Sequence, residues 1–108
     1  MAHRISKTSK NLAVAKAAPS TEQVSKLAYS LVKDVMTKCL DSGKHYPGEW
    51  YAEGYKWHLT RSARHATNSL MLVDGLDKDS KGETALEHAQ GAAIRAIMAM
   101  VCLKNRIK

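Results

Sequence analysis

Apolar residues recur at helical spacing along three long stretches of this 108-residue chain. The first stretch covers residues 20–41, and its apolar positions form a single stripe: Val24, Leu27, Ala28, Leu31, Val35 and Cys39. Ser20 and Gln23 stand three residues apart at its start, which is the spacing of a capping box. The pattern predicts a helix over 20–41 with one buried face.

Two more stretches, over residues 55–73 and 83–105, also have the helical period. The stripe predicted to be buried in the second is Leu59, Ala63, Ala66, Leu70 and Val73. The residues predicted to face inward in the third are Leu86, Ala89, Ala93, Ile97, Met100 and Val101. Because no stretch alternates in the manner of a strand, we expect an all-α fold, with a small three-helix domain over residues 19–108.

Small residues thin one part of the third predicted helix: Ala89, Gly91, Ala92, Ala93 and Ala96. Small side chains let a second backbone approach closely. A domain of this size also has little core of its own. We therefore expect a homodimer that pairs through this face.

The charge is strongly basic, because 17 Lys and Arg against 10 Asp and Glu leave a net charge of +7. Residues 1–18 carry four basic residues and no acidic one, and we expect them to form a flexible basic arm. Such an excess attracts anions, so the expected ligands carry phosphate. No apolar run is long enough for a membrane span, and two cysteines make no disulfide framework. We expect a cytoplasmic protein.

Histidine and arginine gather on the polar flanks of the second and third predicted helices. His58, Arg61, His65 and Asn68 share one flank with Arg64 beside it, and His88, Gly91 and Arg95 share another. Two antiparallel helices would bring these flanks together. Arginine grips phosphate with a planar fork, and histidine binds phosphate or moves a proton near neutral pH. The candidate residues are His65 and His88 as catalytic groups and Arg61, Arg64 and Arg95 as phosphate ligands; the alternative is an ordinary solvated helix face.

Five of the six aromatic residues lie within twelve positions, between Tyr46 and Trp57. Trp50, Tyr51 and Trp57 are the candidates for stacking on a nucleobase, since Tyr and Trp combine a flat face with a polar group. The alternative is that these aromatic side chains close a small core.

Acidic residues provide a weaker pattern. Glu83 and Glu87 stand four apart, so both carboxylates could meet on one helix face and hold a divalent cation such as magnesium. The alternative is that they are first-turn acids favoured by the helix dipole. Residues 77–82 match part of a calcium-binding loop, but Lys81 and His88 occupy positions where that loop needs oxygen ligands. A turn with capping acids is the preferred interpretation.

Four short segments together resemble a known family. They are Gly43-Lys44-His45-Tyr46-Pro47-Gly48-Glu49-Trp50, Arg64-His65, Gly75-Leu76-Asp77-Lys78-Asp79 and His88-Ala89. This set is similar to the N-terminal domain of the dATP/dGTP diphosphohydrolases, a family common in bacteriophages. Glu49 replaces the Asn that precedes the family's Trp, and Ala85 replaces the first His of its His-x-x-His-Ala motif. The resemblance implies a nucleotide ligand, magnesium, release of pyrophosphate and a bacterial host cytoplasm.

Three functions stay open at this point. The first is a nucleotide-phosphate-binding helical domain with a hydrolase of the diphosphohydrolase type as its activity. The second is a basic protein that binds DNA or RNA, because cations interleaved with aromatic side chains suit a stacking platform. The third is a helical protein that binds or inhibits a protein partner. The chain has no phosphate-cradling glycine loop, nucleophile elbow or zinc-ligand spacing.

Overall fold

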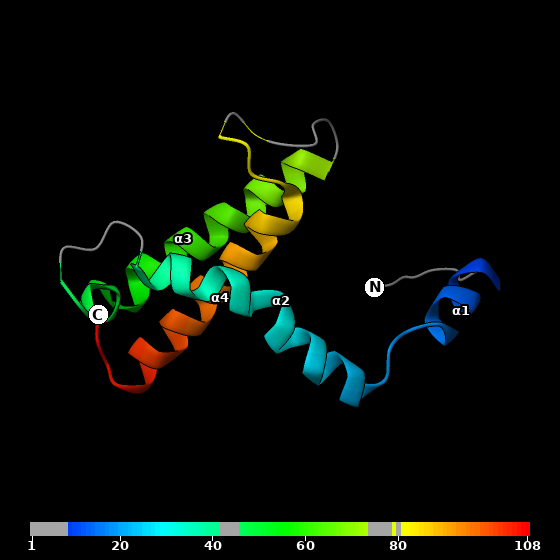
Figure 1. Cartoon of the computed structure of the whole chain (residues 1–108), viewed down its shortest axis with the longest axis horizontal. Helices are drawn as coiled ribbons and strands as arrows, with labels where there is room; N and C mark the ends of the chain where they lie inside the picture. Colours follow the sequence, from blue (N-terminus) through cyan, green and yellow to red (C-terminus); the bar gives the residue numbers. More distant parts are fainter. Residues whose placement is uncertain (1–8, 42–45, 74–78, 80) are drawn as a thin grey trace.

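The computed structural model describes residues 9–41, 46–73, 79 and 81–108, which form four helices and no strand. The helices are α1 (Ser9–Lys16), α2 (Thr21–Asp41), α3 (Glu49–Val73) and α4 (Ala85–Lys104). α3 and α4 lie side by side as an antiparallel hairpin, and α2 crosses the hairpin (Figure 1). The all-α prediction is therefore confirmed.

Capping side chains fix where two helices begin. The backbone N–H of Gln23 donates to Oγ of Ser20 at 3.1 Å, and that of Ser20 donates to Oε1 of Gln23 at 2.7 Å, so the predicted capping box is confirmed. α4 has a second box between Thr84 and Glu87, and it begins at Ala85 rather than at the predicted residue 83.

Part of the predicted basic arm is helical. Residues 1–8 lie outside the described part of the chain, and residues 9–16 form helix α1. Leu12, two alanines and Lys16 favour a helix there, and Pro19 follows soon after its end. α1 stands apart from the hairpin (Figure 1).

A break inside α3 brings the end of the chain against the start of the hairpin. Gly54 has φ 84° and ψ 168°, outside helical geometry, and separates a short first segment from residues 55–73. The N–H of Tyr55 then donates to the carbonyl of Ile107 at 2.9 Å. A Cβ atom on residue 54 would lie 2.0 Å from the carbonyl carbon of Lys108, so only glycine fits.

The face that α3 buries differs from the prediction. Leu59, Leu70 and Val73, predicted to be inside, are 46%, 67% and 68% exposed. Ala63 and Ala66 are exposed as well. A face that includes His58 and His65 of the polar flank packs on α4 instead, and the hydroxyl groups of two serines on this face reach main-chain acceptors there. Oγ of Ser62 donates to the carbonyl of Ala92 at 2.8 Å, and Oγ of Ser69 donates to that of Ala85 at 2.7 Å.

α4 shows the same reversal. All six residues predicted to face inward are exposed: Leu86, Ala89, Ala93, Ile97, Met100 and Val101. Its buried residues are His88, Gly91, Ile94, Met98, Ala99 and Cys102. Gly91 and His88 belong to the predicted polar flank, so the buried face of α4 combines part of that flank with four apolar residues.

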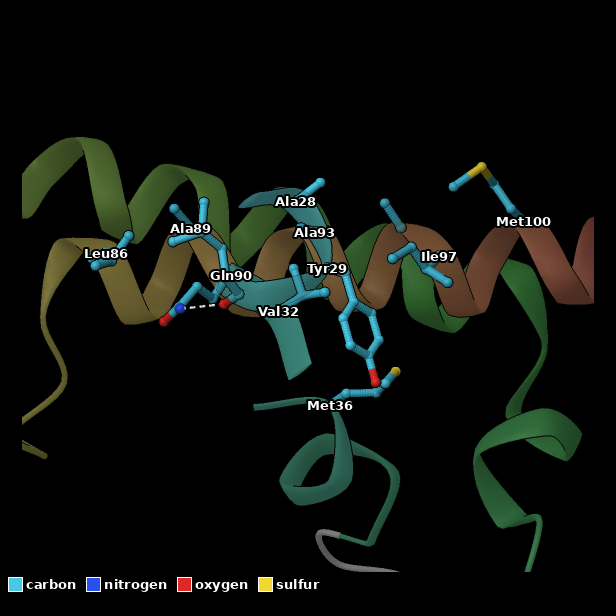
Figure 2. Close-up of a pocket in the computed structure, with 12 residues that line it drawn as sticks. Ala28, Tyr29, Val32, Met36, Leu86, Ala89, Gln90, Ala93, Ile97 and Met100 are labelled. Atoms are coloured by element: carbon cyan, nitrogen blue, oxygen red, sulfur yellow. Dashed lines mark hydrogen bonds between the residues drawn. The ribbon is translucent and has the colours of Figure 1, made fainter. Parts of the chain in front are cut away.

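α2 covers only part of the exposed face of α4. Between them lies an open apolar groove of about 710 Å³, with Tyr29 and Met36 on one side and Ile97 and Met100 on the other (Figure 2). The side-chain amide of Gln90 donates to the carbonyl of Leu31 and ties the two helices together. The predicted α2 stripe is not buried: its first four residues, Val24, Leu27, Ala28 and Leu31, are exposed, and Val35 and Cys39 are only half-buried. The first part of α2 extends beyond the hairpin (Figure 1).

The small residues of α4 are divided between neighbours within the same chain. Gly91 and Ala92 face α3, whereas Ala89, Ala93 and Ala96 line the groove below α2. The homodimer stays a prediction. Over the described ranges, no helix is both long and apolar enough to cross a membrane.

Candidate functional site

A small polar pocket of about 230 Å³ opens between the C-terminal half of α3, the segment that leads into α4 and the first turn of α4. Its lining residues are Arg61, Arg64, His65, Asn68, Asp79, Lys81, Glu83 and His88. Glu83, predicted as a metal ligand, thus lines the pocket, and four of the five predicted arginine and histidine candidates meet here: Arg61, Arg64, His65 and His88. The fifth, Arg95, does not line the pocket.

Two histidines form the floor of this pocket. Nδ1 of His65 on α3 lies 3.0 Å from Nδ1 of His88 on α4, and the ring centroids are 5.3 Å apart. Gly91 leaves room for this contact, because a Cβ at that position would stand 3.3 Å from the His65 ring, closer than an ordinary van der Waals contact. Burial lowers the pKa of His65, and the nearby His88, Arg95 and Arg61 lower it further. His65 is therefore neutral at pH 7.

Asp79 holds the other side of His88. Its Oδ2 lies 2.7 Å from Nε2 of His88, and its Oδ1 accepts the backbone N–H groups of Lys81 and Glu83, both at 2.9 Å. The hydrogen bond with His88 and those from the backbone lower the pKa of the Asp79 carboxyl group. The carboxylate is thereby fixed in orientation as well as ionised.

Cations occupy the rim. The guanidinium of Arg61 lies 4.9 Å from the centroid of the Trp57 ring, a cation–π contact. Arg64 and Lys81 are exposed, and among the described residues neither has an acidic partner. Arg61, Arg64 and Lys81 thus outnumber the two pocket carboxylates.

Arg95 lies deeper in the hairpin, next to His58. The sequence pattern placed His58 on the polar flank but assigned it no function. Nη1 of Arg95 lies 3.1 Å from Nδ1 of His58, which is fully buried and whose Nε2 lies 2.5 Å from the carbonyl oxygen of Trp50. Glu53 comes within 4.0 Å of both side chains. Arg95 is 11% exposed, and burial lowers its pKa. Its interactions join α3 to α4 rather than facing the pocket.

The predicted stacking residues separate in space. Trp57 is 45% exposed and touches Arg61 at the pocket rim. Trp50 and Tyr51 contact each other edge to face, with ring centroids 5.6 Å apart, at the opposite end of α3. Of the three candidates, Trp57 is therefore the one adjacent to the pocket.

The two glutamates predicted as metal ligands also separate. Glu87 accepts the Thr84 N–H in the capping box of α4, whereas Glu83 lies 3.7 Å from Nε2 of His88. Ligand atoms of Asp79, Glu83 and His88 lie within 4.8 Å of one another. One imidazole with two carboxylates suits manganese or zinc better than magnesium, which prefers oxygen ligands. Because the shortest contact is an Asp79–His88 hydrogen bond, we assign no chemical step to a metal.

Sequence analysis missed Asp79 and Lys81 as pocket residues. Asp79 precedes Lys81 and Glu83 by two and four residues, and its side chain accepts hydrogen bonds from their backbone N–H groups. From the sequence alone, an aspartate at this spacing indicates a turn rather than a binding site. The chain matches no protein-family model, no curated protein and no solved structure.

Proposed function

We propose that this protein binds a nucleotide through its phosphate groups in the pocket between α3 and α4. The observation that carries the proposal is the meeting of Arg61, Arg64 and Lys81 around one concave site. Guanidinium groups bind phosphate oxygens in pairs, and Lys81 adds a compact positive charge. The net charge of +7 favours the encounter with an anion.

The size of the pocket limits which part of a nucleotide it can hold. About 230 Å³ is below the roughly 300–1,000 Å³ of pockets that enclose a whole ligand. The phosphates therefore occupy the pocket and the nucleoside extends from it. Trp57 stands next to Arg61, where it can stack on the base.

The resemblance to the dATP/dGTP diphosphohydrolases suggests the reaction to assay. Water would attack a nucleoside triphosphate and release the monophosphate and pyrophosphate. Neutral His65 is suited to accept a proton from that water. Formation of pyrophosphate from dATP or dGTP, measured with and without added divalent cations, tests this part of the proposal.

Calorimetry tests binding separately from the reaction. We expect dATP or dGTP to bind in the presence of EDTA, and Arg64→Ala to weaken binding at least tenfold. Arg64 is exposed on α3, so its loss leaves folding intact. Lys56→Ala removes an exposed cation from the same helix outside the pocket, and we expect it to bind like the wild type. Absence of heat with every nucleotide would refute the proposal.

A further inference from the structure

Asp79, His88 and His65 form a continuous line of hydrogen-bonding atoms. Asp79 Oδ2 is 2.7 Å from Nε2 of His88, and Nδ1 of His88 is 3.0 Å from Nδ1 of His65. The side chain of His88 is only 3% exposed, so water does not compete for either nitrogen. The line begins at a carboxylate and ends at Nε2 of His65, a nitrogen with no hydrogen-bond partner among the residues described.

The positions of the protons along this line follow from donor and acceptor rules. An ionised carboxylate only accepts, so Nε2 of His88 carries the proton that it donates to Asp79. In a neutral imidazole the other nitrogen is then an acceptor, so Nδ1 of His88 accepts from Nδ1–H of His65. With both rings neutral, this leaves Nε2 of His65 without a proton.

We propose that Asp79 is a positioning residue that acts through His88 to hold His65 with its proton on Nδ1, so that Nε2 meets the ligand as a hydrogen-bond acceptor. The backbone around Asp79 supports this role, because the N–H groups of Lys81 and Glu83 both hold Oδ1 and keep Oδ2 toward His88. Glu83 itself is 3.7 Å from His88, too far to replace that hydrogen bond.

The consequence is that the arginines and His65 bind different groups of the ligand. A lone pair on His65 disfavours a fully ionised phosphate oxygen and favours an O–H group. The arginines therefore take the phosphate oxygens, and His65 takes a hydroxyl group or a water molecule next to them. This assignment of the ligand rests on the proposed function, whereas the proton position on His65 can be measured without any ligand.

Nitrogen-15 NMR of the imidazole rings at pH 8.5, about two units above the ordinary pKa of a histidine, tests the proposal. In the wild type we expect the His65 signals of a protonated Nδ1 and an unprotonated Nε2. Asp79→Asn keeps an oxygen for the two backbone N–H groups but turns an NH₂ group toward His88. Nε2 of His88 then becomes an acceptor, and we expect both rings to exchange their protonated and unprotonated nitrogens.

Glu83→Gln provides the matched control, since it removes a pocket charge 3.7 Å from His88 and leaves the Asp79–His88 and His88–His65 hydrogen bonds in place. We expect its ring signals to show the same protonated and unprotonated nitrogens as the wild type. A wild-type His65 protonated on Nε2 would overturn the proposal, as would an Asp79→Asn variant with unchanged tautomers. Should Asp79→Asn fail to fold, the wild-type spectrum alone decides. Failure of nucleotide binding in calorimetry would leave these spectra unaffected, so the two proposals fail separately.

Discussion

Arg95 donates a hydrogen bond from Nη1 to Nδ1 of His58 at 3.1 Å, inside the α3–α4 hairpin. His58 therefore has its proton on Nε2, which donates to the carbonyl of Trp50 at 2.5 Å. A second proton on His58 would place an N–H donor at Nδ1 opposite the Nη1 donor of Arg95, and it would add a positive charge beside that buried guanidinium. The hairpin thus folds around a neutral histidine.

Stability should consequently fall on acidification. Burial is the largest cause that lowers the pKa of both His58 and His65 below the ordinary 6.5. Because the unfolded chain binds these protons more readily, the stabilisation is complete above pH 6.5 and is lost as the pH falls below it. We expect the free energy of unfolding, measured by urea denaturation, to be lower at pH 5 than at pH 7.5.

The variant His58→Gln provides a check, since we expect its stability to depend less steeply on pH than that of the wild type. A stability that is constant from pH 5 to 8, or that rises with acid, would contradict this account.

A comparison of Gly54 with Gly48 tests whether the close contact between residue 54 and the end of the chain matters for stability. Both have positive φ, 84° and 80°, so alanine costs roughly 1–2 kcal/mol of backbone strain at either position. Only at residue 54 would the new Cβ also collide with Lys108. We expect Gly54→Ala to lower the free energy of unfolding by at least about 1 kcal/mol more than Gly48→Ala. Equal losses in thermal or urea denaturation would show that the contact at Lys108 is unimportant.

Leu70 and Leu72 test which face of α3 is buried. Leu72 is 7% exposed and Leu70 is 67% exposed. We expect Leu72→Ala to cost about 2–4 kcal/mol and Leu70→Ala less than about 0.5 kcal/mol in urea denaturation. The reverse order would restore the buried stripe predicted from the sequence. A Leu70→Ala cost that depends on protein concentration would indicate self-association through this face of α3, which differs from the homodimer predicted through α4.

Deletion of residues 1–18 separates nucleotide binding from nucleic-acid binding. These residues carry a charge of +4, and α1 stands apart from the pocket. We expect the truncated protein to keep its affinity for a nucleotide in calorimetry. Any affinity for a DNA or RNA oligonucleotide should fall with the deletion and with added salt, because it depends on counterion release. A parallel loss of both affinities would place the arm in the nucleotide site.

The sequence predicted where the helices lie along the chain better than it predicted which face of each helix is buried. Ser20 and Gln23 specify a helix start through bonds within four residues, so the capping box could be recognised without knowing the fold. The buried face of α3 depends instead on main-chain acceptors of α4, which Ser62 and Ser69 reach across the hairpin. Periodicity identifies two candidate faces on such a helix but not the one that a neighbour covers.

The candidate site shows the same division. His65 and His88 could be paired from the expectation of an antiparallel hairpin, because each lies on a polar flank. Arg95 lies on the same flank as His88, yet burial beside His58 turns it away from the pocket. Asp79 could not be recognised as a partner of His88, because their contact depends on the path of the chain between α3 and α4.

The pocket has a mechanical consequence for the molecule. Its lining residues come from both legs of the hairpin and from the connection between them, near the end where the legs are joined. An anion gripped there would clamp the two legs together, and unfolding would require its release. Occupancy at a hundred times the dissociation constant would stabilise the fold by about 2.7 kcal/mol. In a dye-based thermal-shift screen of small phosphorylated compounds, the natural ligand would therefore be recognised by the increase in melting temperature that it causes.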